Sequence, residues 1–142
     1  MTEFADGEKN MESEIPNIRG KRFYRPWVLF LYSVLANFPI AIFLYGINVH
    51  RRGSRVAGSA LKGVAAVMMA MITIMAITGT GVQAIHWVLI GIAIGIGLMQ
   101  AEKNDYDKCI AQGALAAKWW PPLLVLLVQF MVVFMMAGIH DR

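Results

Sequence analysis

Four long stretches that are almost free of charged side chains constrain this chain more than any other feature. They cover residues 27–48, 56–78, 84–100 and 119–139, and Lys62 is the one charged residue within them. A charge at the centre of a bilayer costs ~2.5–3.5 kcal/mol, so uncharged runs of about 20 residues are what membrane helices require. The composition agrees, because 15% of the residues are charged, whereas soluble domains have about 25%. We expect an all-α integral membrane bundle built from these four apolar segments.

The charged residues lie around these segments. Residues 1–18 are acidic and poor in apolar side chains, which is the composition of a disordered tail. Residues 19–142 then form a single membrane domain. The net charge of +4 comes from Lys and Arg next to apolar runs, where they set topology and attract anionic head groups. We therefore expect the lipid bilayer, and no nucleic acid, as a partner.

The connections between the segments differ in character. Residues 79–83 form an uncharged, glycine-rich turn, which predicts that the second and third segments are an antiparallel hairpin. Residues 102–118 are polar and mixed in charge, with a modest apolar stripe at Ile110 and Leu115. We expect this connection to lie along the membrane surface as an amphipathic helix. Cys109, the single cysteine, falls within it and allows no internal disulfide.

The first segment contains the sequence Asn37-Phe38-Pro39. Proline lacks a backbone donor and disfavours helical geometry in the residue before it, so these residues predict a broken helix. If the segment nevertheless crosses the membrane, the basic residues divide between both sides with no clear bias. If it is re-entrant, nearly all of them share one side and Arg142 is left on the other. The positive-inside rule favours the re-entrant arrangement, although both remain open from the sequence.

That arrangement predicts a multi-pass protein of the plasma (inner) membrane with its basic loops in the cytoplasm. The cytoplasmic basic cluster would then be Arg51, Arg52 and Arg55. Tryptophan is enriched at membrane interfaces, and the segment ends carry the predicted interfacial anchors Trp27, Trp87, Trp119 and Trp120.

Small residues line the third segment at Gly91, Gly95 and Gly97. Such residues let helix backbones approach closely in lipid. We expect this face to pack within the chain against Ser59 and Gly63 of the second segment, and the alternative is a dimer interface.

The segments contain little that could carry chemistry. No acidic residue occurs in any of them, which argues against an ion-coupled exporter. The sequence offers no Ser/His/Asp set, phosphate-binding loop or paired carboxylates, so we expect no enzymatic activity and no cofactor. Methionines within the segments and histidines at their ends leave a metal or haem carrier as a remote alternative; the histidines are His50, His86 and His140.

Residues 38–41 (FPIA) and 45–53 (YGINVHRRG) are followed by a helix of small residues, and later Gln100-x5-Tyr106-x6-Gly113 leads into Trp119-Trp120. Across residues 27–130 this pattern resembles a group of small bacterial membrane proteins of uncharacterised function. In that group a Gly-Pro-Leu-Ala-like break precedes an apolar helix that ends in an Asn-aromatic-basic-x-Leu-Gly-like turn. Here Asn37-Phe38 stand where glycines would precede the proline. The resemblance implies a break at Pro39 and no mechanism.

The function that these features favour is an accessory, scaffolding or partner-binding membrane subunit. Its partner would be another membrane protein or a second copy of the chain. The alternative is a small channel or permease in which Asn37 and Pro39 form a non-helical lining, as the broken helices of transporters do.

Overall fold

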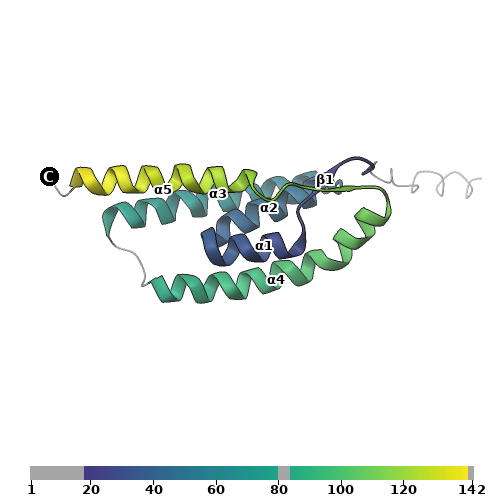
Figure 1. Ribbon diagram of the computed structural model, residues 1–142, viewed down its shortest axis with the longest axis horizontal. Coiled ribbons are helices and arrows are strands. Elements are labelled where there is room, and N and C mark those ends of the chain that lie inside the picture. Colours follow the sequence, from purple (N-terminus) through teal and green to yellow (C-terminus); the bar gives the residue numbers. More distant parts are fainter. Residues whose placement is uncertain (1–17, 80–83, 141–142) are drawn as a thin grey trace, which may run out of the picture.

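The computed structural model describes residues 18–79 and 84–140, which are mostly helical, so the all-α prediction is confirmed (Figure 1). Apart from Ile18, the predicted acidic tail lies outside the described residues. The elements, in chain order, are strand β1 (Arg22–Phe23), helix α1 (Pro26–Tyr32), the π-helical turn η2 (Ser33–Asn37), helices α2 (Phe38–Arg51), α3 (Arg55–Thr78) and α4 (Ala84–Ala111), strand β2 (Leu115–Ala116), and helix α5 (Pro121–His140).

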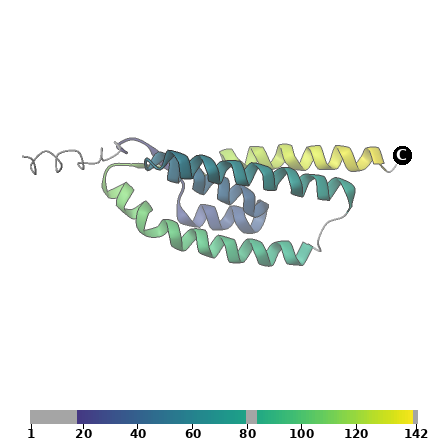
Figure 2. The ribbon, with the colours of Figure 1, turned by 180° about the vertical axis from the view of Figure 1, so that it is seen from behind.

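The helices form three layers (Figure 1, Figure 2). Helices α1 and α2 make the middle layer, with α4 on one side and α3 and α5 on the other. Helices α3 and α4 run in opposite directions, as predicted. They are not a packed hairpin, however, because the α1–α2 pair lies between them.

The chain reverses its direction between α1 and α2. The backbone N–H of Tyr24 donates to Asn48 Oδ1 over 2.9 Å, and Asn48 Nδ2 donates to the Tyr24 carbonyl over 2.9 Å. A straight helix of ~1.5 Å per residue would hold these residues about 36 Å apart. The first apolar segment therefore folds back on itself, and its two ends are neighbours.

The backbone at Asn37-Phe38-Pro39 stays helical where a break is predicted. Residues 33–37 form the π-helical turn η2, and Pro39 is the second residue of α2. Proline cannot donate to the carbonyl of Leu35, four residues earlier, and a helix that skips such a bond widens into a π turn. The helix axis is therefore broken between Tyr32 and Phe38, just before Pro39, and the turn η2 makes the reversal without an unwound stretch.

Two glycines end the neighbouring helices. Gly53 lies between α2 and α3 with φ 108°, and Gly79 ends α3 in the left-handed region with φ 66°. Residues other than glycine rarely adopt these backbone φ angles. Helix α3 is the one helix, within the described part of the chain, that is long and apolar enough to cross a membrane, and almost none of its apolar stretch is buried inside the protein.

Helix α4 continues without interruption from the third apolar segment to Ala111. The prediction that residues 102–118 form a separate connection is therefore wrong for residues 102–111. After α4 the chain forms β2, which pairs with β1 in parallel, Arg22 opposite Leu115 and Phe23 opposite Ala116. Cys109 lies on α4, buried together with Phe23 beneath this strand pair. We call this end of the molecule the strand end.

Candidate functional site

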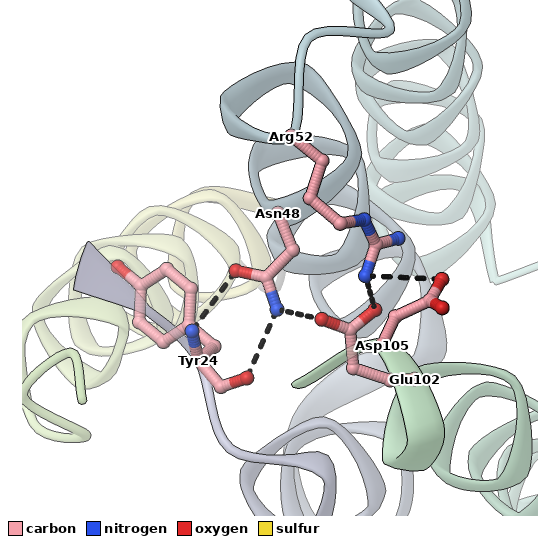
Figure 3. Close-up of polar contacts among 5 residues, drawn as sticks. All are labelled: Tyr24, Asn48, Arg52, Glu102 and Asp105. Carbon is pink, nitrogen blue, oxygen red and sulfur yellow. Dashed lines mark hydrogen bonds and ion pairs between the residues drawn. The ribbon is translucent and has the colours of Figure 1, made fainter. Parts of the chain in front are cut away.

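Three polar side chains at the strand end form a buried cluster, which we call the polar cluster: Asn48, Arg52 and Glu102 (Figure 3). Asn48 and Glu102 are fully buried. Asn48 Nδ2 donates to Glu102 Oε1 over 2.7 Å, and Arg52 Nη1 donates to Glu102 Oε2 over 2.8 Å. Both oxygens of Glu102 thus accept hydrogen bonds, which suits an ionised carboxylate.

The local helices place these groups. Asn48 lies in the last turn of α2, and Arg52 directly follows this helix, with its backbone N–H donating to the Asn48 carbonyl over 3.0 Å. The two residues are four apart and therefore lie on one side of the helix end. The C-terminal end of a helix also favours a cation such as Arg52. Glu102 lies on α4, and Asp105, three residues later on the same helix, is 3.6 Å from Arg52. The cluster therefore joins the end of α2 to the middle of α4.

Asn48 connects the segment before α1, at Tyr24, to helices α2 and α4. Its amide oxygen accepts from Tyr24 N–H, and its amide nitrogen donates to both the Tyr24 carbonyl and Glu102 (Figure 3). Both amide hydrogens of Asn48 are therefore used. An aspartate could not donate these two bonds, so the site requires an amide at this position.

Burial and charge pairing oppose each other in the polar cluster. Burial raises the pKa of Glu102, while the charge and hydrogen bond of Arg52 and the hydrogen bond of Asn48 act in the opposite direction. Burial lowers the pKa of Arg52, but the nearby carboxylate of Glu102 raises it, and the net shift of this pKa is upward. Burial likewise raises the pKa of the Cys109 thiol, one helical turn beyond Asp105. A thiol of this kind is a poor nucleophile.

A second contact holds the far end of the α1–α2 pair. Ser33 Oγ donates to the Gly91 carbonyl over 2.6 Å. A Cβ on Gly91 would lie 2.4 Å from the Ser33 carbonyl oxygen, and a Cβ on Gly95 would lie 3.0 Å from the Phe30 ring. Gly91 and Gly95 therefore pack against the first segment. The prediction that they pack against the second segment is wrong.

The other predicted packing residues do not take part in such contacts. A Cβ on Gly97 or on Gly63 would meet no atom within 4 Å, and Ser59 is exposed. The close glycine of α3 is instead Gly58, where a Cβ would lie 2.5 Å from the backbone nitrogen of His50. Gly58 escaped the sequence analysis because small residues recur all along α3.

The predicted basic cluster is divided in the structure. Arg52 turns inward to Glu102, and Arg51 donates to the carbonyl of Arg22, the first residue of β1. Only Arg55 of the three is exposed. Arg52 is thus part of the interior of the protein rather than of a solvated basic surface.

The four tryptophans lie near both ends of the helices. Trp27, Trp119 and Trp120 are about half exposed. Trp87 is partly buried and stacks on Phe38, with ring centroids 5.7 Å apart. These positions leave the role of interfacial anchor as a prediction.

Within the described residues, no group of three or more His, Cys, Asp or Glu side chains could hold a metal ion, and every buried side-chain nitrogen and oxygen atom has a hydrogen-bond partner. The side chains of Asn37 and His140 lie outside the described part. The arrangement is one that ties three segments of the chain together.

Sequence reasoning missed Glu102 because it follows the third apolar segment and looks like the start of a polar connection. The available signal was the spacing of Asn48 and Arg52 on one helix face, together with an acid just past an uncharged run.

No protein-family model, curated protein or solved structure matches this chain. The resemblance to small bacterial membrane proteins stays a prediction.

Proposed function

We propose that this protein is a non-enzymatic integral membrane protein that acts as an accessory or scaffolding subunit and binds a partner through its outer helix faces. The observation that carries the proposal is the contrast between the interior and the surface. Interior polar groups bind one another, whereas large apolar side chains are exposed along three helices. On α3 these include Val64, Val67, Met71 and Ile74; on α4 Val88, Leu89, Ile90 and Ile96; and on α5 Leu124, Leu127, Phe130 and Met135.

Exposure on this scale favours lipid or protein as the surroundings of these helices. Monomeric soluble proteins rarely expose apolar patches larger than a few hundred Å². In this proposal α3 crosses the plasma (inner) membrane. Helices α4 and α5 cross it beside α3, because the uncharged run 84–100 lies in α4 and most of the run 119–139 lies in α5.

The α1–α2 pair enters the membrane from the strand end and returns to it. From Asn48 to Phe38 the pair extends about 15 Å, at ~1.5 Å per residue, which is about half of a hydrocarbon core of ~30 Å. A re-entrant hairpin of this length places the polar cluster near the membrane interface.

The charge distribution supports a cytoplasmic position for the strand end. The segment before α1, the turn between α2 and α3, and the connection between α4 and α5 all lie there (Figure 1, Figure 2). These segments contain the basic residues Arg19, Lys21, Arg22, Arg25, Arg52 and Lys118, and Arg51 and Arg55 flank the turn between α2 and α3. Positively charged loops stay on the cytoplasmic side.

The partner is either a different membrane protein or a second copy of this chain, and photo-crosslinking in intact cells tests the proposal. A crosslinking amino acid replaces Val67 or Met71 of α3, Leu89 of α4, or Leu127 of α5, all exposed. We expect one adduct of defined mass from positions on one helix face. Leu29, which is fully buried in the core, is the interior control position and should give no such adduct.

Two results separate the proposal from its alternatives. Adducts of many masses from every exposed position would contradict a specific partner. Release of the protein from membranes by alkaline carbonate would contradict membrane integration itself.

A further inference from the structure

A cavity of about 290 Å³ lies between α2, α3 and the first turn of α5. One wall is a stripe along α2, at residues spaced three and four apart, and the other walls come from α3 and α5. The residues that form these walls are Ile40, Phe43, Leu44, Ile47, Met69 and Pro121.

The size and lining of this cavity suit an apolar ligand. Its volume is at the lower end of the ~300–1,000 Å³ typical of small-molecule sites. Enclosed apolar spaces of about 150 Å³ already bind small hydrophobic molecules. A helix, about 10–12 Å across with its side chains, needs far more room, so the cavity fits a single flexible chain.

The protein carries positive charge beside this cavity. Tyr24 lines the cavity and is followed by Arg25, and Pro121 lines it shortly after Lys118. Ala117 N–H donates to the Phe23 carbonyl over 2.7 Å. The strand pairing therefore brings the backbones of Arg25 and Lys118 close together, and both side chains are exposed.

Two tryptophans next to Lys118 are typical of the head-group region of a membrane. Trp119 and Trp120 lie between Lys118 and Pro121 and are about half exposed. In a membrane, Trp is enriched at the head-group level and Lys and Arg attract anionic lipids there. An apolar cavity next to two segments that each carry an exposed cation matches the two parts of an anionic phospholipid.

We propose that the cavity holds one acyl chain of an anionic phospholipid whose phosphate is bound by Arg25 and Lys118. The proposal rests on the proposed placement in the membrane, with the strand end at the cytoplasmic interface. The lipid then fills the space between α2 and α5 and links the middle layer to the outer layer.

Native mass spectrometry of the purified full-length protein tests this proposal. The protein is incubated with phosphatidylglycerol or with phosphatidylcholine of the same acyl chains. We expect one retained phosphatidylglycerol, at about tenfold higher affinity than phosphatidylcholine. Met69→Trp fills the cavity and should lower retention of phosphatidylglycerol about tenfold. Met71→Trp, on the exposed side of the same helix, is the matched control and should retain the lipid.

The head-group contacts are tested separately. Arg25→Gln combined with Lys118→Gln should remove the preference for phosphatidylglycerol over phosphatidylcholine and leave binding of the chain. If Met69→Trp lowers the helical content measured by circular dichroism, Phe43→Trp replaces it as the filling variant.

Three results would overturn the proposal: no retained lipid on the unchanged protein, equal retention in a folded filling variant, or an unchanged preference in the double variant. A protein that stays in carbonate-washed membranes yet retains no lipid contradicts this inference alone. A protein that the wash releases contradicts the proposed function.

Discussion

At the level of single residues, Asn48 and Glu102 show how a polar group is accommodated in an apolar interior. Both side chains are fully buried. Asn48 donates hydrogen bonds to Tyr24 and to Glu102, and Glu102 accepts the second of these. Removing one partner of a buried ion pair costs ~3–5 kcal/mol, because the remaining charge is left without compensation. Replacing both partners by apolar residues costs much less. The polar cluster is therefore a specific connection between distant segments rather than a large net source of stability.

This reasoning gives a prediction for Arg52 and Glu102. Arg52→Met leaves the fully buried Glu102 carboxylate without its cationic partner and should lower the free energy of unfolding by ~3–5 kcal/mol. The double variant Arg52→Met/Glu102→Leu should be more stable than Arg52→Met alone. Unfolding in detergent, followed by circular dichroism, measures both.

Arg55→Met is the control, since Arg55 is exposed, and it should change the stability by less than about 0.5 kcal/mol. Additive effects of the two substitutions would show that Arg52 and Glu102 do not act as a pair.

At the level of elements, the fold depends on how closely α4 approaches the turn between α1 and α2. The Ser33–Gly91 hydrogen bond and the contact of Gly95 with Phe30 both require the absence of a side chain on α4. Close backbone approach replaces the hydrophobic driving force that helices lack in lipid. The contact at Gly91 and the polar cluster together fix the α1–α2 pair at both of its ends.

Gly91→Ala is therefore predicted to destabilise the protein. The added Cβ would lie 2.4 Å from the Ser33 carbonyl oxygen, which forces the two backbones apart and should cost ~1–3 kcal/mol. Gly97→Ala is the matched control on the same helix, because its Cβ would meet nothing within 4 Å. It should be neutral or slightly stabilising, since alanine favours helix more than glycine does. Equal melting temperatures of the two variants would contradict the packing at Gly91.

At the level of the whole molecule, the proposed topology follows from the reversal between α1 and α2. If α3, α4 and α5 span the membrane as proposed, their odd number places the two ends of the described chain on opposite sides. Four full spans would place them on the same side. The two arrangements therefore differ in an observable way.

Cysteine accessibility distinguishes them in a background of Cys109→Ala. Single cysteines replace Arg22, Ser54, Asn104 and Thr80. A membrane-impermeant maleimide should label the first three from the cytoplasmic side and position 80 from the other side. Ala65→Cys, which is buried, is the unlabelled control. Labelling of positions 22 and 54 from opposite sides would reject the re-entrant hairpin.

The uncharged runs of the sequence determined the helical segments and most of their ends. The predicted segment 56–78 differs by one residue from α3 (Arg55–Thr78), and the segment 119–139 lies close to α5 (Pro121–His140). These features are local, because hydrophobicity and glycine placement act within one segment. The tertiary structure alone decided that α4 continues past Gln100, that α1 and α2 lie between α3 and α4, and that Glu102 is buried. Asn48 and Glu102 are 54 residues apart, and their pairing depends on how helices pack, which no local pattern of either segment encodes.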